Sequence, residues 1–213
     1  MAEASKAGDV DEARIVLGLL EYVGRGGEQS QRRLASELGV ALGLANAYLK
    51  RCVKKGLVKV RQAPARRYAY YLTPRGFAEK SRLTLEFMSY SFALFRRAKA
   101  DCMAALEAAR ERGYTRIALI GASDLAEIAA ICALDGGFVI TAVVDANVAA
   151  ARFAGAPVVR NVDSLQPLPD AVLVTDMQAA AATVRMAEAK FSPERVLAPS
   201  LLGVRLSAAQ RDA

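Results

Sequence analysis

The sequence contains no histidine, and only three of its 213 residues are cysteines. Without histidine the chain lacks the commonest general base and the commonest metal ligand, which counts against many hydrolytic mechanisms. The cysteines, Cys52, Cys102 and Cys132, are odd in number and scattered, without the spacing of a metal site. We therefore expect reduced thiols, no metal site and no enzymatic activity.

Long apolar runs are missing too. No stretch approaches the roughly 18 consecutive apolar residues of a membrane span, and the polar, acid-containing residues 1–10 do not resemble a signal peptide. With 54% hydrophobic and 24% charged residues, the composition is typical of a globular protein. A chain of 213 residues can form two small domains, and we expect a cytoplasmic protein with no membrane partner.

Acidic residues are scarce in one part of the chain. Residues 1–112 hold 21 Lys and Arg against 12 Asp and Glu, a net charge of +9, whereas residues 113–213 hold 8 against 10, a net charge of −2. Between residues 50 and 82 there are eleven basic residues and a single acid, Glu79. A solvated basic surface is one explanation, but concentration on one segment favours binding to a polyanion.

Two helices are expected at the start of the chain. Apolar residues at helical spacing predict a first helix that begins at Asp11-Glu12 and ends in the glycine-rich residues 24–27. Ser30 can cap a second helix over residues 31–38.

A tight turn, a third helix and a hairpin should follow. Gly39 can adopt the left-handed conformation that the turn needs, and a third helix is predicted over about residues 41–55. Strands are expected at residues 57–60 and 68–72, with a turn over residues 63–67. This order of elements is that of a winged helix-turn-helix.

The third helix should lie in the major groove of double-stranded DNA, with its N-terminal residues nearest the bases. Asn46 is the best candidate for reading a base because its amide can pair bidentately with adenine, although an ordinary solvated residue is the alternative. Leu42, Leu44 and Ala47 can contact thymine methyl groups, while basic side chains can contact phosphates or, at the wing tip, a minor groove. The predicted DNA-binding residues are Ser30, Gln31, Arg32, Leu42, Gly43, Leu44, Asn46, Ala47, Lys50, Arg51, Arg66 and Arg67.

The run "SQRRLASELGVALGLANAYLKRCVKKGLVKV", followed by "YAYYLTPRGFAEK", resembles the MarR-type winged-helix regulators, most closely the subgroup associated with exopolysaccharide gene clusters. The resemblance covers about residues 11–100 and implies a transcriptional regulator that binds double-stranded DNA. Ala41 stands where many such regulators place a Ser or Thr cap on the recognition helix. Its absence costs about 1 kcal/mol of helix stability and a phosphate contact.

A long helix is predicted over residues 79–112, where the sequence has no proline and no glycine. It carries two apolar stripes, one of Leu83, Phe87, Tyr90 and Leu94, the other of Leu85, Met88, Phe92, Phe95, Cys102 and Leu106. Two apolar faces imply burial on two sides. We expect this helix to pair with a second copy in a homodimer, the alternative being burial between the chain's own two domains.

Beyond Gly113, short apolar strands alternate with helices. Strands are predicted at residues 116–120, 138–144, 157–159, 171–175 and around 196, and helices at 124–134 and 179–190. Strands separated by single helices imply a parallel sheet. The predicted fold class is therefore an α/β multidomain protein with a winged helix-turn-helix (1–78), a long connecting helix (79–112), a small parallel-sheet Rossmann-like domain (113–205) and a tail (206–213).

The turn after the first of these strands partly matches a dinucleotide-binding fingerprint. In G-x-G-x-x-G the glycine positions correspond to Gly121, Ser123 and Ala126, and the ribose-binding acid corresponds to Asp145. Ser123 is the defect, since its side chain restricts how closely a pyrophosphate approaches the backbone. Its hydroxyl can instead donate to a single phosphate at the helix N-terminus.

The segments "IALIGASDLAEIAA", "VVD" and "GAPV" resemble the N-terminal domain of sugar O-acyltransferases of the sialic-acid and bacillosamine type, and CoA-binding-like domains, across about residues 115–200. A winged helix joined to a Rossmann domain is also similar to repressors that sense NADH. The resemblance implies a nucleotide sugar, NAD(P)H or a CoA-type molecule as ligand. The predicted ligand-binding residues are Gly121, Ala122, Ser123, Asp124, Leu125, Asp145, Thr175 and Asp176.

Three functions are consistent with these features. The leading hypothesis is a dimeric, sequence-specific transcriptional regulator modulated by a nucleotide-like effector in its C-terminal domain. The second is a regulator without a ligand, whose Rossmann-like domain serves assembly. The third, a nucleotide-sugar-modifying enzyme tethered to DNA, is disfavoured because the sequence has no nucleophile elbow and no Tyr-x-x-x-Lys pair.

Overall fold

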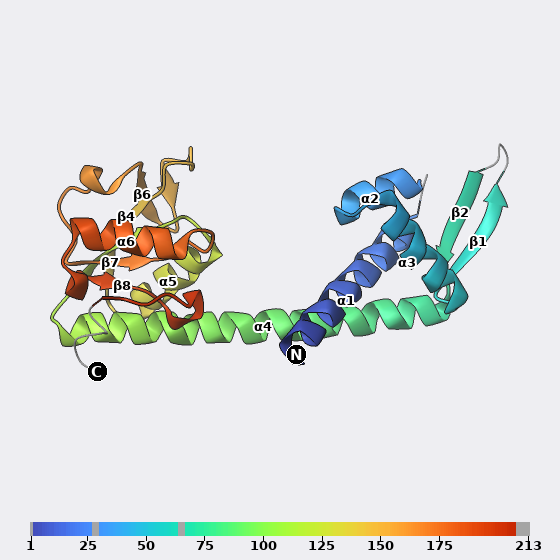
Figure 1. The fold of residues 1–213 in the computed structure, drawn as a ribbon, viewed down its shortest axis with the longest axis horizontal. Helices are drawn as coiled ribbons and strands as arrows, with labels where there is room; N and C mark the ends of the chain where they lie inside the picture. Colours follow the sequence, from blue (N-terminus) through green and yellow to red (C-terminus); the bar gives the residue numbers. More distant parts are fainter. Residues whose placement is uncertain (1, 27–29, 64–66, 208–213) are drawn as a thin grey trace. The chain divides into compact units, whose positions relative to one another are not determined.

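The computed structural model describes residues 2–26, 30–63 and 67–207, with the side chains of residues 12–26, 30–61 and 68–207. The chain forms two compact units, residues 1–91 and 92–213, each described here by itself (Figure 1). The first unit contains α1 (Ala2–Gly24), α2 (Gln31–Leu38), α3 (Leu42–Lys54), β1 (Val58–Ala63), β2 (Arg67–Leu72) and the first part of α4 (Pro74–Glu111). The predicted winged helix-turn-helix is confirmed.

The ends of α2 follow the predicted signals. Ser30 Oγ accepts a hydrogen bond from the Arg33 N–H at 3.1 Å and so caps the helix. Gly39 closes the helix at φ 63°, in the left-handed region that favours glycine. Ala41 precedes α3 and, as an alanine, supplies no side-chain cap.

The start of α1 was predicted wrongly. The helix begins at Ala2 rather than at Asp11. Residues 2–10 contain three alanines and no proline, so a helix that has nucleated further along can extend through them at little cost. The acids Asp11 and Glu12 lie inside the helix, where they mark no terminus.

The core of the first unit lies among its helices and the base of the hairpin. Each helix turns an apolar face inward, and Leu19, Leu20 and Ala45 are fully buried. The cluster also contains Leu34 of α2, and its buried members outside the first three helices are Leu57, Val58 and Leu83. α4 therefore contributes directly to the core that supports α3.

Thr73 joins the hairpin to α4. Its Oγ1 donates to the Gly56 carbonyl at 2.7 Å and accepts from the Gly76 N–H at 2.9 Å, which caps α4, while Pro74 fills the first helical position. A Cβ on Gly76 would lie 2.0 Å from the carbonyl oxygen of Leu57. Only glycine lets α4 start this close to the base of β1, and this contact explains the glycine of the "LTPRG" motif.

The second unit is built on one six-stranded sheet. Its strands are β3 (Arg116–Ile120), β4 (Val139–Val144), β5 (Arg152–Phe153), β6 (Ala156–Val159), β7 (Ala171–Val174) and β8 (Val196–Leu197), in the order β5-β6-β4-β3-β7-β8. All neighbouring strands pair in parallel except β5, which pairs antiparallel with β6 at one edge. The predicted parallel sheet is confirmed.

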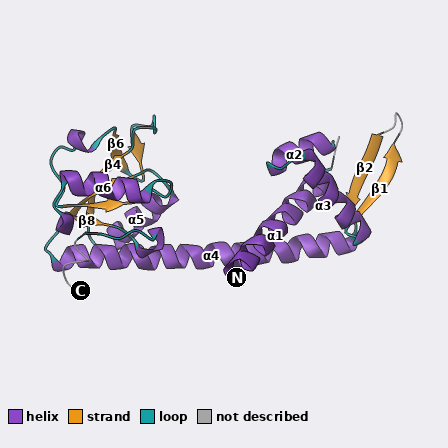
Figure 2. Cartoon of the chain, viewed as in Figure 1, coloured by secondary structure: helices purple, strands orange, loops and turns teal. Residues whose placement is uncertain are grey.

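Helices cover both faces of this sheet (Figure 2). The last part of α4 and α5 (Asp124–Asp135) bury one cluster with Ile117 and Leu119 of β3. α6 (Ala180–Lys190) buries the other with Ala118 and Ile120. Alternate residues of β3 thus serve opposite faces, as the pleat of a strand requires.

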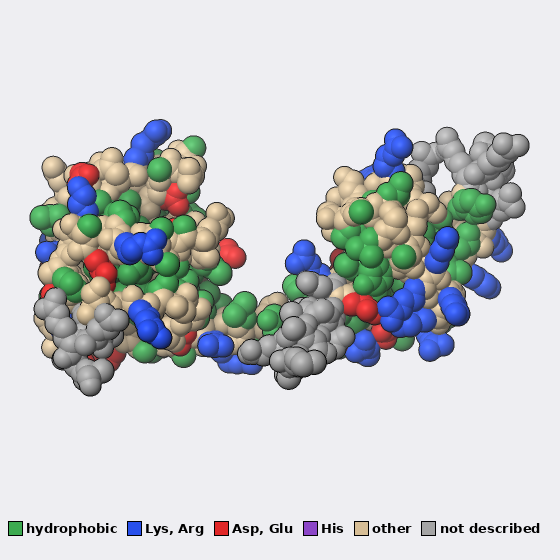
Figure 3. Space-filling model, in the orientation of Figure 1, with side chains coloured by type: hydrophobic (Ala, Val, Ile, Leu, Met, Phe, Trp, Pro, Cys, Tyr) green, Lys and Arg blue, Asp and Glu red, His purple; other side chains and the backbone are tan. Residues whose placement is uncertain are grey.

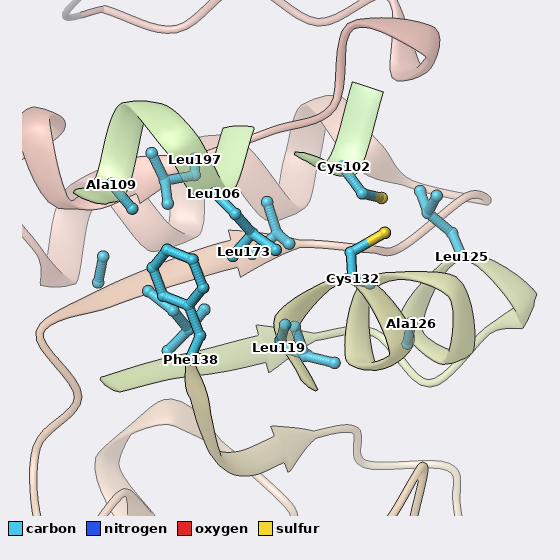
Figure 4. Packing of buried hydrophobic residues seen from close by; sticks show 14 of the residues in the cluster. Cys102, Leu106, Ala109, Leu119, Leu125, Ala126, Cys132, Phe138, Leu173 and Leu197 are labelled. Atoms are coloured by element: carbon cyan, nitrogen blue, oxygen red, sulfur yellow. The ribbon is translucent and has the colours of Figure 1, made fainter. Parts of the chain in front are cut away.

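The second unit begins at Phe92, not at residue 113 where the sequence placed its boundary. Ala98, Cys102, Leu106 and Ala109 of α4 are all buried in its core. Figure 4 shows Leu106 beside Leu173 of β7, and Cys102 beside Cys132 of α5. The long helix is therefore part of the core of the α/β domain over about its last four turns.

One connection differs from the predicted alternation of strands and helices. Residues 145–155, all described, contain no helix between β4 and β6. They form the short strand β5 and a tight turn in which Ala154 and Gly155 have φ values of 47° and 81°. A small hairpin therefore replaces a crossover helix at this edge.

Two glycines in helices should respond oppositely to alanine. Gly76→Ala is expected to destabilise the protein by about 3 kcal/mol, because the new methyl group meets the Leu57 carbonyl and overpacked sites shift backbone. Gly43→Ala is expected to stabilise it by about 0.5 kcal/mol, since a Cβ there meets nothing within 4 Å and alanine favours helix. Urea unfolding followed by circular dichroism measures both. Equal stability of the two variants would contradict the packing described for Gly76.

Candidate nucleic-acid interface

The outer face of α3 carries two small residues and two lysines. Ala45, Leu49 and Cys52 are buried in the core. On the opposite side lie Gly43, Ala47, Lys50 and Lys54, spaced four, three and four residues apart and all exposed. Two small residues followed by two lysines let the helix backbone approach a partner closely at one end and attract negative charge at the other.

A groove runs between α3 and the hairpin. Its volume is about 530 Å³. Its lining residues come from α2, α3, β1 and β2: Gln31, Asn46, Leu49, Lys50, Val53, Lys54, Val60, Tyr68 and Tyr70. The Gln31 side-chain N–H donates to the Tyr70 hydroxyl at 3.0 Å, which links α2 to the wing across the groove.

Asn46 lies on the wall of this groove and is half-buried. Its Oδ1 is buried and has no hydrogen-bond partner among the described residues. A buried acceptor without a donor costs about 1–3 kcal/mol. In this orientation the amide does not offer both of its groups to one base, as the predicted bidentate contact with adenine requires.

Exposed cations lie on α3 and β1: Lys50 and Lys54 line the groove, whereas Lys59 and Arg61 flank Val60 on the other face of the hairpin. Lys50, Lys54, Lys59 and Arg61 are exposed, and none of them forms an ion pair with the part of the chain that the structure describes. Figure 3 shows Lys and Arg side chains gathered where α3 ends and the hairpin begins. Free surface cations of this density attract a phosphate backbone.

Several predicted contact residues already have partners in the chain. Ser30 caps α2, and Gln31 is bonded to Tyr70. Arg51 Nη1 lies 2.7 Å from Glu12 Oε1 of α1, away from the groove. Arg66 lies outside the described residues, and Arg67 is described only as the first residue of β2.

The sequence interpretation missed Lys54 and the two tyrosines of the groove. Lys54 lies one turn beyond Lys50, so helical spacing could have found it. Tyr68 and Tyr70 alternate along β2, and Val60 pairs with Tyr70, which places all three on one face of the hairpin. The pattern "YAYY" alone does not say which face meets α3.

The predicted ligand loop of the second unit is tied to its neighbours. A Cβ on Gly121, at φ 104°, would lie 2.6 Å from the Asp176 backbone. Ser123 caps α5 and its hydroxyl donates to the Thr175 carbonyl at 2.7 Å. The fully buried Thr175 hydroxyl donates to the Gly121 carbonyl at 2.6 Å. These side chains hold two loops together and have no free polar atom to offer a ligand.

The two predicted ligand-binding carboxylates, Asp145 and Asp176, accept hydrogen bonds from backbone N–H groups. Asp145 accepts from the N–H of Ala122 at 2.9 Å and of Asn147 at 2.8 Å. Asp176 accepts from the N–H groups of Gln178 and Ala179 and from the Thr183 hydroxyl. Burial acts to raise the pKa of Asp176, but these hydrogen bonds lower it overall, so the group is ionised at neutral pH.

The other predicted ligand residues add little to a phosphate site. Leu125 is buried in the core, while Asp124 is exposed in the first turn of α5 together with Glu127. These acids complement the helix dipole and repel a phosphate from the same N-terminus. The residues that partly match the glycine fingerprint are thus used for internal contacts.

The cysteines are buried. Burial raises the pKa of Cys52 to about 11 and that of Cys102 to about 12. Protonated thiols are poor nucleophiles and poor metal ligands. No cluster of three or more His, Cys, Asp or Glu that could hold a metal occurs among the described residues. In the same part of the chain, no helix is long and apolar enough to cross a membrane.

Comparison with known proteins agrees with the first unit. Residues 13–59 match a family model described as winged helix-turn-helix DNA-binding. The chain therefore carries a winged helix-turn-helix DNA-binding domain, and the match ends at the start of the wing. No curated protein matches the chain significantly.

Solved structures that resemble the chain include a transcription regulator and methyltransferases. A MarR family transcription regulator is 22% identical with a TM-score of 0.36 and covers 44% of this chain and 68% of its own. Human N-acetylserotonin methyltransferase, in complex with SAM, is 14% identical with a TM-score of 0.38 and covers 92% of this chain and 76% of its own. An O-methyltransferase from neocarzinostatin biosynthesis is 15% identical, with a TM-score of 0.38 over 90% of this chain and 82% of its own.

Lys50 and Arg51 are neighbours that should affect DNA binding differently. Lys50→Ala is expected to weaken binding to all sequences and to lower the slope of log affinity against log salt by about one, because one phosphate contact is lost. Arg51→Ala should leave that slope unchanged, since Arg51 pairs with Glu12. Fluorescence anisotropy over a salt series measures both. A reduced slope for Arg51→Ala alone would contradict the interface described.

Proposed function

We propose that this protein is a dimeric, sequence-specific transcriptional regulator. The observation that carries the proposal is the exposed face of α3, flanked by a groove and by unpaired cations, within a winged helix-turn-helix. α3 fits the major groove, and the hairpin extends to the neighbouring backbone or minor groove. The net charge of +9 in residues 1–112 supports DNA binding by this part of the chain.

A salt titration on random and on selected duplexes tests the DNA-binding step. The full-length protein is titrated onto random duplexes and onto duplexes selected by the protein itself from a random library. Binding should weaken steeply with salt on both, and the selected sequences should bind at least a thousandfold more tightly. A salt slope near zero on every duplex would rule out DNA binding as the function.

The dimer is supported by the surface of α4. Seven large apolar side chains over residues 85–95 are exposed in the single chain: Leu85, Phe87, Met88, Tyr90, Phe92, Leu94 and Phe95. Hydrophobic side chains are visible on this helix in Figure 3. They form two stripes, with Leu85, Met88, Phe92 and Phe95 on one face of the helix and Phe87, Tyr90 and Leu94 on another, and exposed apolar surface of this extent marks an association surface. A second copy of the chain is the occupant that also supplies a second reading helix.

A charge placed on this patch should separate the copies. Phe92→Asp is expected to convert the dimer into a folded monomer and to weaken operator binding by at least tenfold, because desolvating a carboxylate in an apolar interface is unfavourable. Leu134→Asp is the matched control, since Leu134 is 81% exposed on α5. Light scattering after size-exclusion chromatography gives the mass. A wild-type monomer at micromolar concentration, or a dimeric Phe92→Asp, would contradict this interface.

For the second unit, assembly is better supported than nucleotide sensing. Its first loop and the end of β7 use their polar atoms on each other, and Asp145 and Asp176 place negative charge on the N–H groups that a phosphate would need. A regulator whose Rossmann-like domain serves assembly is consistent with this arrangement.

Thermal unfolding distinguishes these roles. UDP-sugars, NADH, NADPH and acetyl-CoA are each expected to leave the melting temperature unchanged, whereas a ligand at 100 times its Kd would add about 2.7 kcal/mol. A selected DNA duplex serves as the positive control and should raise the melting temperature. A clear stabilisation by any of the four ligands would restore the sensing hypothesis.

A further inference from the structure

The tip of the reading helix is almost entirely apolar. Residues 42–47 read Leu-Gly-Leu-Ala-Asn-Ala, and Ala41 before them supplies no side-chain cap. No side chain in this stretch carries a charge, and the first cation of α3, Lys50, comes about two turns after Leu42. The residues nearest the base edges therefore differ sharply in chemistry from those that meet phosphates.

Two leucines flank the bare strip of the helix. Leu42 is 43% exposed and Leu44 is 45% exposed. Because successive residues are separated by about 100° around a helix, they project on either side of the strip formed by Gly43 and Ala47. A Cβ on Gly43 would meet nothing within 4 Å, so the fold itself does not require a glycine there.

Asn46 is the one polar side chain of the tip, and its Oδ1 is turned inward. That oxygen is buried without a hydrogen-bond partner among the described residues, on the wall of the groove rather than on the outer strip. The side chains that read guanine bidentately, Arg and Lys, do not occur at the tip. At the tip of α3, direct hydrogen-bond readout is therefore restricted to Asn46.

The major groove has one apolar feature, the C5-methyl group of thymine. We propose that this protein recognises its operator through thymine methyl groups, contacted by Leu42 and Leu44 in an A·T-rich half-site. Gly43 and Ala47 allow the helix to come close enough for these contacts, and Lys50 and Lys54 hold the flanking phosphates. The inference rests on the proposed DNA-binding function and adds to it the chemistry of the sequence that is read.

Replacing thymine by uracil tests the proposal because it removes the methyl group and keeps every base-pairing hydrogen bond. The operator duplex is the one selected by the full-length protein from a random library. Each thymine of a half-site is replaced by uracil in turn, and affinity is measured at fixed salt. Each contacted methyl group should contribute about fourfold, the value of one buried methylene-sized group.

Uracil also alters the shape of DNA, so the leucines that would contact the methyl groups must be replaced as well. In Leu42→Ala and Leu44→Ala, which leave a good helix former at an exposed site, the uracil effect should vanish at the base that each leucine contacts. Lys54→Ala is the control: it should weaken binding to thymine and uracil duplexes alike.

The outcomes separate the inference from the proposed function. If uracil leaves the affinity of the wild type unchanged, or weakens the leucine variants as much as the wild type, the methyl contacts do not exist. Sequence-specific, salt-dependent binding would then persist, and the proposed function as a DNA-binding regulator would be unaffected. If no duplex is bound, the proposed function fails and the inference fails with it.

Discussion

The structure depends on one helix that is buried in two different hydrophobic cores. Leu83 of α4 lies in the core that supports the reading helix, while Ala98 to Ala109 of the same helix lie against the sheet of the second unit. Burial of this kind stabilises by roughly 25 cal/mol per Å² of apolar surface, so each unit depends on part of α4 for its stability. The exposed apolar residues 85–95 are the part of the helix that neither core uses.

The first unit was largely predictable because its signals are local. A capping serine at residue 30, a glycine at residue 39 and helical spacing in α2 and α3 each act within a few residues. Two helix starts were wrong: α1 begins at Ala2 rather than Asp11, and α4 begins at Pro74 rather than residue 79. The predicted buried face of α3 agrees with the structure, but which polar side chains are free to meet DNA depends on distant partners, such as Glu12 for Arg51.

The second unit shows the limit of a motif. Five of its six strands were placed to within a residue by apolar runs and β5 was missed, and the glycine fingerprint could not show what the loop contacts. Ser123 and Thr175 are 52 residues apart and Ala122 and Asp145 are 23 apart, and only the folded sheet brings them together. The same residue types can therefore bind a phosphate or bond to neighbouring loops. Which of the two occurs depends on the hydrogen-bond partners that the fold brings close.

The contact between Gly76 and the Leu57 carbonyl has a consequence for how the wing behaves. Thr73 is bonded to the Gly56 carbonyl just after α3, and α4 packs against Leu57 just before β1, so the base of the hairpin is held on both strands. The base of the hairpin, as far as the structure describes it, is thus fixed against α3 and α4 and has little conformational freedom to lose when the domain meets DNA. Affinity therefore depends in part on how well this fixed surface matches the duplex, and sequences that require it to change shape are bound more weakly.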